Sequence, residues 1–233
     1  MTNQEYMDYL FKTYELIHLF SNKNDCRVLH VRHQKLKKDL VIHILPQPLL
    51  AYEMLCDVQC DNLPVIYDVI YTDDGMIVLE EYIDGMTLAE SMVVSQYDYR
   101  KAKHIIYAVC NACSVLHGKG LVHRDIKPEN ILIDQNNRIV LIDFNISRQI
   151  TESNCDTVIM GTLGYAAPEQ MGITQSVTHT DIYAIGVLLN VILTGKHPCE
   201  KLASGRAKHI IGKCTHINPR QRYPDVHKLV GSL

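Results

Sequence analysis

Apolar and polar residues alternate over short stretches in the first third of the chain, a pattern that predicts strands. Asp73, Asp74 and Gly75 form a strong hairpin turn between the last two of these stretches. Pro46 and Pro48 keep a helix from starting before about residue 49, so one short helix is expected at 49–58. The pattern predicts a small antiparallel sheet of five strands, at residues 16–19, 28–32, 40–45, 65–71 and 76–82.

After Gly85 the apolar residues recur every three or four positions, which is typical of helices. Helices are expected at 87–94 and 98–117, with Gly118 and Gly120 ending the second. Two very short strands, at 131–133 and 139–142, are joined by a polar turn. Residues 181–193 are apolar on all sides, which predicts a buried central helix. The second part of the chain is therefore expected to be mainly helical.

Composition limits the classes of partner. The chain has 233 residues, of which 47% are hydrophobic and 21% charged, enough for a sizeable core. Its net charge of −3 is small and its Lys and Arg residues are scattered, so neither nucleic-acid nor membrane binding is expected. The first residues lack a basic segment followed by an apolar one, which predicts a cytoplasmic protein.

The eight cysteines are dispersed and are expected to be free thiols. Cys110 and Cys113 alone have the spacing of zinc ligands, but they fall within the apolar pattern of a helix. Zinc binding remains an alternative to the burial of these cysteines as small hydrophobic residues.

Residues 123–130, HRDIKPEN, are the most informative segment of the chain. They resemble the catalytic loop of protein kinases at every signature position. Phosphoryl transfer requires a carboxylate to receive the hydroxyl proton, a cation near the moving phosphate, and magnesium ligands. The resemblance assigns these roles to Asp125, Lys127 and Asn130. The lysine two residues after the aspartate marks the resemblance as one to the serine/threonine kinases.

The sequence Asp143-Phe144-Asn145 stands where the family has Asp-Phe-Gly. The resemblance makes Asp143, together with Asn130, the ligand of magnesium. Asn145 replaces the glycine, and asparagine is the other residue that best tolerates left-handed backbone angles, so this is a mild departure.

Residues 161–169, GTLGYAAPE, resemble the end of a kinase activation segment. The resemblance implies that Glu169 pairs with Arg222, and that Asp181 anchors the backbone of the catalytic loop. It also places Thr162 close to Asp125 and Lys127, as a further catalytic residue. Activating phosphorylation is expected earlier in the activation segment, at Thr151, Ser153 or Thr157. Arg124 would receive the phosphate.

From about residue 79 to 233 the match is continuous, and the chain looks most like the small intracellular serine/threonine kinases of bacteria. The resemblance implies an α+β, bilobal protein-kinase-like fold. A small N-lobe (about 1–82), with the five-stranded antiparallel sheet and one short helix, would precede a larger, mainly helical C-lobe (about 86–233). Residues 1–233 would form a single domain.

The N-lobe departs from the family pattern in its phosphate-binding loop. Kinases cover the ATP phosphates with G-x-G-x-x-G-x-V, because only glycine lets backbone amides approach so closely. Aligned on Val28, the three glycine positions hold Ser21, Lys23 and Cys26. No glycine occurs between Met1 and Gly75, so no shift of the alignment restores the motif.

The V-A-I-K motif of the family reads LVIH here, so His43 stands in place of the lysine that holds the α- and β-phosphates. Val41 replaces the alanine that lies against adenine. Ala51 stands where the helix should carry the partner glutamate of that lysine, and Glu53 is two residues away, on another face. The resemblance places the nucleotide among Val28, Val41, His43, Glu81 and Leu132.

Lys23 offers an alternative cation, since its ammonium group could reach the phosphates from a different strand. The simpler interpretation is a solvated turn lysine.

Two hypotheses follow. The first is a pseudokinase, a regulatory or scaffolding module that binds a protein partner and has lost catalysis with its N-lobe motifs. The alternative is an active but atypical serine/threonine kinase that uses ATP and Mg²⁺ to phosphorylate protein hydroxyls. ATP and Mg²⁺ are expected as cofactors only if nucleotide binding is retained. A small-molecule phosphotransferase is a third possibility, which the peptide-substrate segment at 161–169 disfavours.

Overall fold

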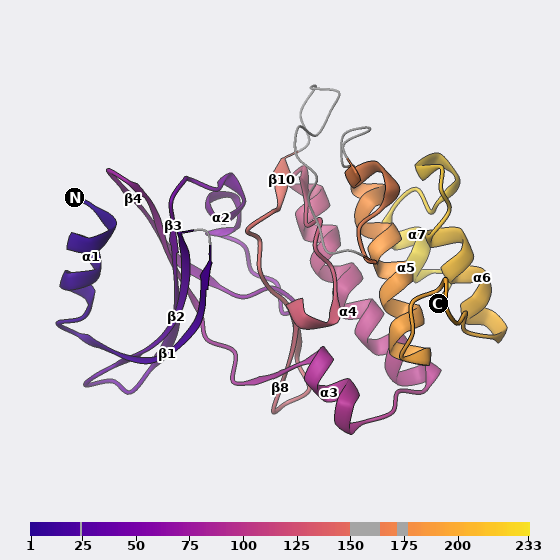
Figure 1. Ribbon diagram of the computed structural model, residues 1–233, viewed down its shortest axis with the longest axis horizontal. Helices are drawn as coiled ribbons and strands as arrows, with labels where there is room; N and C mark the ends of the chain where they lie inside the picture. The colour runs from indigo at the N-terminus through magenta and orange to yellow at the C-terminus, as the bar shows by residue number, and fades with distance from the viewer. Residues whose placement is uncertain (24, 150–163, 172–176) are drawn as a thin grey trace. The chain divides into compact units, whose positions relative to one another are not determined.

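The computed structural model describes residues 1–23, 25–149, 164–171 and 177–233 (Figure 1). Its contacts divide the chain into two compact units. The first unit consists of Met1–Cys60 and Pro64–Asp84, and the second of Asp61–Leu63 and Gly85–Leu233. The division falls close to the lobe boundary expected from the sequence. The expectation that both lobes form one domain stays a prediction.

The first unit contains the five-stranded antiparallel sheet that the alternating pattern predicts, in the order β1-β2-β3-β5-β4. Pairing of Thr72 with Gly75 confirms the hairpin between the last two strands. The strands are β1 (Tyr14–Lys23), β2 (Cys26–His33), β3 (Asp39–Leu45), β4 (Ile66–Thr72) and β5 (Gly75–Glu81).

Two helices cover opposite faces of this sheet (Figure 1). Helix α1 (Asn3–Leu10) was not anticipated from the sequence, and it begins with a capping box between Thr2 and Glu5. Its Met7 and Leu10 form a core with the apolar side chains of one sheet face, namely Leu29, Val31, Ile42, Ile44 and Ile77. Helix α2 (Leu50–Leu55) is shorter than expected and lies against the other face, the one that carries His43.

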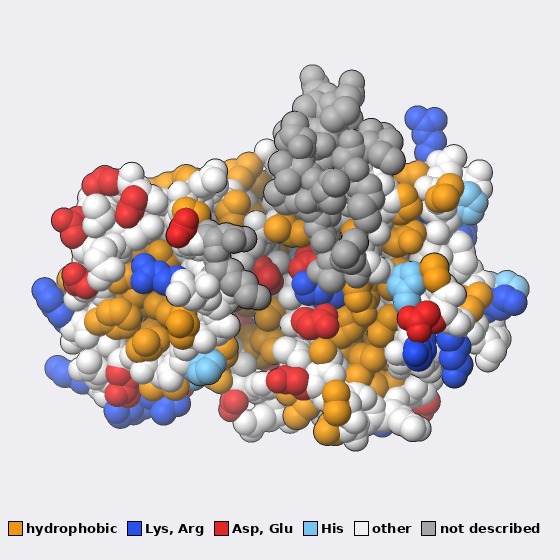
Figure 2. Space-filling model, in the orientation of Figure 1, with side chains coloured by type: hydrophobic (Ala, Val, Ile, Leu, Met, Phe, Trp, Pro, Cys, Tyr) orange, Lys and Arg blue, Asp and Glu red, His pale blue; other side chains and the backbone are white. Residues whose placement is uncertain are grey.

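Strand β1 is an edge strand with much of its apolar surface open to solvent. Leu16, Ile17, Leu19 and Phe20 are exposed, and Figure 2 shows apolar side chains gathered on the surface of this unit. Irregular register at Ile17 and Phe20 interrupts the pairing of β1 with β2. Such bulges are one way in which proteins protect an edge from unwanted strand pairing.

The second unit is mainly helical, as predicted. Helix α4 (Tyr99–Gly118) is capped by Asp98 and buries one face, whereas α5 (Thr178–Thr194) is buried almost all round and is the predicted central helix. It starts three residues before the expected Asp181. The remaining helices are α3 (Leu88–Val94), α6 (Gly205–Cys214), α7 (Val226–Val230) and the single turns η1 (Pro128–Asn130), η2 (Pro168–Met171) and η3 (Pro219–Gln221).

Short strands of the second unit hold the loops that carry the candidate site. β6 (Gly85–Thr87), β8 (Ile131–Asp134) and β9 (Ile139–Leu141) form one antiparallel sheet, and β7 (Leu121–Val122) pairs with β10 (Arg148–Gln149). The catalytic-loop segment therefore lies between β7 and β8. Across the described ranges, no helix is both long enough and apolar enough to cross a bilayer.

Candidate active site

The loop between β7 and β8 is anchored by Asp181, as the resemblance implied. Asp181 lies in the first turn of α5 and is fully buried. Its Oδ2 accepts the backbone N–H of His123 at 2.9 Å, and its Oδ1 accepts that of Arg124 at 2.9 Å. Arg124 has a left-handed backbone with φ of 73°, which is uncommon for a residue with a side chain. The carboxylate thus holds an unusual turn in place.

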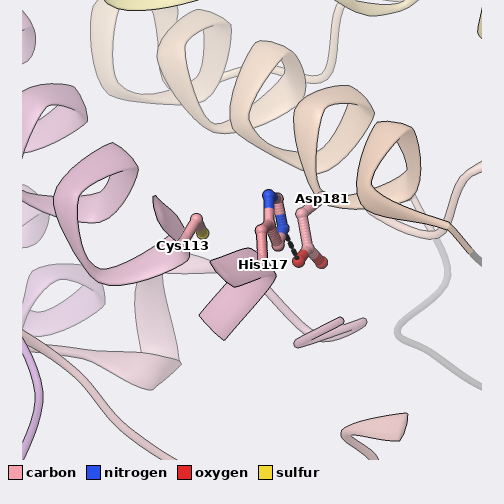
Figure 3. Close-up of side chains that lie close together, drawn as sticks. All are labelled: Cys113, His117 and Asp181. Carbon is pink, nitrogen blue, oxygen red and sulfur yellow. Dashed lines mark hydrogen bonds and ion pairs between the residues drawn. The ribbon is translucent and has the colours of Figure 1, made fainter. Parts of the chain in front are cut away.

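His117 completes the surroundings of this carboxylate (Figure 3). Its Nε2 lies 2.8 Å from Oδ2 of Asp181. Burial alone would raise the pKa of Asp181, but the hydrogen bond and charge of His117 and the backbone donors outweigh it, so the pKa of Asp181 is lowered. Asp181 is therefore a buried, ionised anchor.

Cys113 is the third residue of this cluster, and its sulfur lies within 4.8 Å of the ligand atoms of His117 and Asp181. Its burial raises the pKa of its thiol well above the usual value, and burial raises the pKa of Cys110 to about 12. Both oxygens of Asp181 already accept backbone N–H groups. The burial of Cys110 and Cys113 agrees with their interpretation as small hydrophobic residues of a helix.

Asp125, Lys127 and Asn130 form one connected group. Lys127 Nζ lies 2.7 Å from Asp125 Oδ2, and Asn130 Nδ2 donates to the same oxygen and to the backbone carbonyl of Asp125, at 2.9 Å each. Asp125 and Lys127 are partly exposed, whereas Asn130 is buried. The predicted acid–base residue is thus held by the predicted cation and the predicted metal ligand, while its side chain stays within reach of solvent.

Asp143 follows β9 and sits beside this group. The backbone N–H of Ile142 donates to the carbonyl of Asn130 at 2.9 Å, which ties the two segments together. Phe144 is fully buried and its ring packs edge-on against His123 at 5.5 Å between centroids. Burial lowers the pKa of His123, because an imidazolium is poorly solvated there.

The left-handed residue of this segment is Asp143 itself, with φ of 70°, and not Asn145. Asn145 therefore does not need the tolerance of left-handed angles that was expected to make this departure mild. Asn145 adopts an ordinary backbone conformation and donates its N–H to Asp143 Oδ1 at 3.2 Å. Replacement of glycine at position 145 requires no special backbone here.

The donor atoms of Asn130 and Asp143 fit a magnesium ion. The amide nitrogen of Asn130 is used toward Asp125, so the carbonyl oxygen Oδ1 is the atom of this side chain that can act as a ligand. Asp143 supplies carboxylate oxygens from the adjoining segment. Oxygen atoms of this kind are the ligands that Mg²⁺ prefers.

In the first unit, His43 is buried on the sheet face that α2 covers. Its Nε2 lies 3.3 Å from Oε1 of Glu80 on β5, and its Nδ1 lies 3.4 Å from the hydroxyl of Tyr52 on α2. Ala51, the residue aligned with the family's glutamate, is buried, and Glu53 is exposed. Neither supplies a carboxylate to His43. Glu80 supplies it instead.

The other predicted nucleotide residues are divided between the units. Val28 lies opposite His43 in the pairing of β2 with β3, and Val41 shares the face of His43 because it is two residues away on the same strand. Glu81 ends β5, and its carboxylate accepts the backbone N–H of Val65 at 3.1 Å. Leu132 lies in β8 of the second unit and is half-buried.

A tight hairpin replaces the glycine-rich loop. Ser21 and Lys23 belong to β1 and Cys26 begins β2, with Lys23 paired directly to Cys26. Asp25 in the turn has φ of 62°. All three former glycine positions therefore sit within regular strands, where each carries a side chain.

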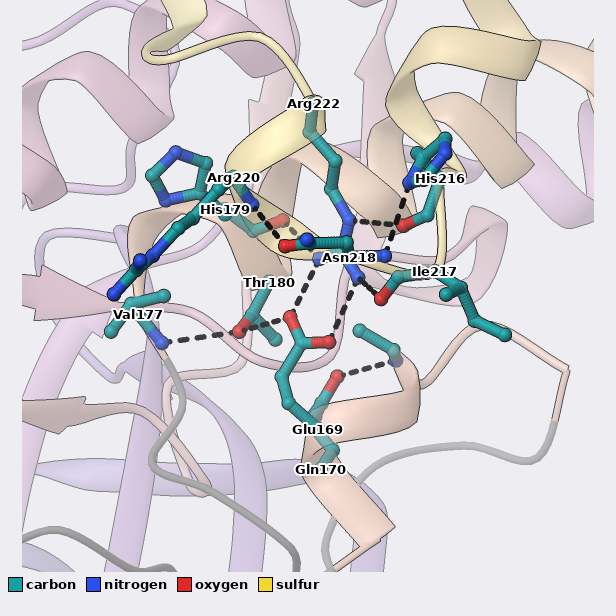
Figure 4. Close-up of polar contacts among 11 residues, drawn as sticks. Glu169, Gln170, Val177, His179, Thr180, His216, Ile217, Asn218, Arg220 and Arg222 are labelled. Atoms are coloured by element: carbon teal, nitrogen blue, oxygen red, sulfur yellow. Dashed lines mark hydrogen bonds and ion pairs between the residues drawn. The ribbon is translucent and has the colours of Figure 1, made fainter.

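Glu169 and Arg222 form the predicted pair (Figure 4). Two parallel hydrogen bonds, of 2.6 and 2.8 Å, join the guanidinium group to the carboxylate, and both side chains are buried. Thr180 also donates to Glu169 at 3.1 Å. Thr162, and the phosphorylation candidates Thr151, Ser153 and Thr157, lie outside the described residues.

Comparison with known proteins gives the family. Residues 37–229 match the protein kinase domain. The chain therefore belongs to the protein kinase family, whose members typically use ATP and Mg²⁺.

Its relatives include bacterial serine/threonine kinases. The chain is 32% identical over 197 residues to serine/threonine-protein kinase D of Synechocystis, a match that covers 74% of this chain and 38% of that protein. It is 36% identical over 157 residues to serine/threonine-protein kinase PrkC of Bacillus subtilis, covering 64% of this chain and 24% of that protein. The chain thus spans well under half the length of these relatives.

Sequence reasoning missed Glu80 and Tyr52. Glu80 had one signal, since it is a charged residue that continues the apolar stretch from Met76 to Leu79 in a central strand. Tyr52 had none, because its role depends on which face of α2 meets the sheet.

Proposed function

We propose that the chain is an atypical, ATP- and magnesium-dependent serine/threonine protein kinase that transfers the γ-phosphate to protein hydroxyls. The observation that carries this proposal is the connected group of Asp125, Lys127 and Asn130 on a loop held by Asp181. A chain that no longer needed phosphoryl transfer would have little chemical reason to hold these side chains together.

Each residue of this group has a defined task. Asp125 accepts the proton of the attacking hydroxyl, and Asn130 fixes the orientation of its carboxylate. Lys127, 2.7 Å from Asp125, brings a positive charge next to the position of the moving phosphate. Asn130 Oδ1 and Asp143 would hold magnesium, which when bound neutralises charge on the phosphates.

The first unit would contribute less than in other kinases. His43 is shorter than lysine, and the hairpin of β1 and β2 cannot offer closely approaching glycine amides. Positioning of the phosphates would therefore depend mainly on magnesium and the second unit, which favours a slow enzyme.

The pseudokinase hypothesis remains the second candidate, and the same hairpin favours it. Side chains at all three glycine positions, together with His43 in place of lysine, remove the usual phosphate contacts of the first unit. On this hypothesis the chain would bind a protein partner, and the group around Asp125 would bind nucleotide weakly or not at all.

Transfer of labelled γ-phosphate from ATP separates the two candidates. Wild type, Asp125→Asn and Asp98→Asn are compared for autophosphorylation and for phosphorylation of a serine- and threonine-containing peptide library. Asp98→Asn makes the same chemical change at a helix cap, where asparagine is an equally good residue. A kinase loses about 100-fold or more with Asp125→Asn alone. Equal, background-level labelling of all three proteins would contradict the proposed kinase activity and favour the pseudokinase hypothesis.

A further inference from the structure

The contact between His43 and Glu80 joins two buried, ionisable side chains. Their exposed fractions are 6% and 5%, and the nitrogen–oxygen distance is 3.3 Å. His43 pairs with Val78 in the register of β3 and β5, so Glu80 is its diagonal neighbour on the same sheet face. Burying a carboxylate is costly unless a cation or hydrogen-bond donors compensate for its lost solvation. The geometry makes His43 the side chain that can compensate for the lost solvation of the Glu80 carboxylate.

Glu80 has more acceptor capacity than His43 satisfies. Oε1 lies 3.3 Å from His43 Nε2 without hydrogen-bond geometry between the two atoms, whereas Oε2 is buried with no hydrogen-bond partner in the described part of the chain. An imidazole presents one N–H from Nε2, but an ammonium group presents three donors that can rotate toward both oxygens. The environment of Glu80 therefore suits a lysine at position 43 better than the histidine present.

Tyr52 contacts the His43 ring at the nitrogen that does not face Glu80. Its hydroxyl lies 3.4 Å from Nδ1, its ring centroid lies 5.3 Å from that of His43, and its side chain is fully buried. The two ring nitrogens thus face groups from two different elements, β5 and α2. This arrangement fixes the ring orientation.

We propose that Glu80 is a positioning residue, which holds the side chain at position 43 for the nucleotide and takes the role that a glutamate on α2 has in other kinases. The proposal rests on the proposed function, because it assigns a task to the nucleotide face of the first unit. It requires no carboxylate from α2, where position 51 is an alanine and Glu53 is exposed. It also implies that the partner of the side chain at position 43 lies within the sheet.

The first test uses the protein without nucleotide. The titration of His43 is followed by NMR of its ring in wild type, Glu80→Gln and Asp39→Asn. Removing the carboxylate beside a buried imidazole should lower the pKa of His43 by about one to three units. Asp39→Asn is the matched control, because Asp39 approaches a different histidine of the same sheet, His30, at 2.7 Å. An unchanged His43 titration in Glu80→Gln would overturn the proposal.

The second test measures magnesium–ATP affinity. His43→Lys should bind about tenfold more tightly than wild type, since it gives the phosphates a charged donor, and His43→Lys combined with Glu80→Gln should lose that gain. Glu80→Leu, which also removes the carboxylate and leaves an apolar side chain in the buried site, serves if Glu80→Gln fails to fold. Equal gains with and without Glu80 would contradict the proposal. If no variant binds nucleotide while the NMR shift is present, the proposed function fails and the pairing stands.

Discussion

Arg222 holds Glu169 through two parallel hydrogen bonds in a site that excludes solvent from both side chains. Arg222 comes from the segment after α6 and Glu169 from η2, so the pair ties together segments 53 residues apart. We expect Arg222→Met to reduce the free energy of unfolding by about 3–5 kcal/mol, because it leaves a buried carboxylate without its partner. Urea denaturation measures the change.

The double variant Arg222→Met with Glu169→Gln tests whether the two side chains stabilise the fold as a pair. Removing both charges should cost clearly less than the sum of the two single changes, since no unpaired charge remains. Additive losses would show that the two side chains stabilise the fold independently.

Asp181→Asn should weaken the fold and the catalytic loop together. The amide keeps the size of the carboxylate but presents only one acceptor oxygen to the N–H groups of His123 and Arg124, which now use both. A loss of about 2–3 kcal/mol in unfolding free energy is expected, and hydrogen exchange at these two amides should accelerate. Asp98→Asn, at an exposed helix cap, should leave both measurements unchanged.

Stability should decline in mild acid. The pKa of His123 is lowered by burial, and that of His179 is lowered by burial and by the nearby charge of Arg222. Between these folded-state values and the usual value of about 6.5, the unfolded chain binds more protons than the folded one. The unfolding free energy should therefore be fully retained above pH of about 6.5 and fall as the pH drops through the folded-state values. Asp181, with its lowered pKa, adds a further loss in stronger acid.

Denaturant titrations at a series of pH values measure this decline. His179→Gln removes one of the titrating groups and should make the dependence shallower. An identical slope in that variant would contradict the assignment to His179.

Thiol reactivity should separate three buried cysteines from the exposed Cys199. Burial raises the pKa of Cys110 to about 12, and the pKa values of Cys113 and Cys214 are also raised by burial. Cys199 is exposed. Because the thiolate is the reactive form, iodoacetamide at neutral pH should label Cys199 and leave these three unlabelled until urea unfolds the chain. Mass spectrometry reads each site.

The same cysteines allow a check on zinc. Incubation with a chelator should leave the melting temperature unchanged, because the cluster of Cys113, His117 and Asp181 is held by its own hydrogen bonds. A drop in melting temperature that added zinc reverses would restore the metal hypothesis.

The sheet and the main helices could be predicted because the local pattern determines them. Alternation gave the strands of the first unit, the turn at Gly75 set the last hairpin, and the apolar run near Asp181 identified the central helix. Helix α1 was missed because its apolar side is short, with Met7 and Leu10 as its main buried residues. Its capping box, Thr2 with Glu5, was the available signal.

The two parts of the candidate site differ in how far sequence reveals them. Asp125, Lys127 and Asn130 lie within six consecutive residues, so a motif can carry their arrangement. His43 and Glu80 meet only because β3 and β5 pair in one particular register, and a shift of one residue would turn Glu80 to the other face. Such a pair becomes visible only when the register is known.

On the proposed role of Glu80, that register also affects how the first unit can be controlled. Where the partner of the β3 cation lies on a helix, swinging the helix outward breaks the ion pair and turns the enzyme off. His43 and Glu80 instead lie on neighbouring strands, joined by a continuous ladder from Leu40 with Glu81 to Leu45 with Met76. A displaced α2 would carry Tyr52 away from His43 and leave this ladder in place. On the proposed role of Glu80, movement of α2 would therefore change the orientation of the His43 ring without separating the two strands.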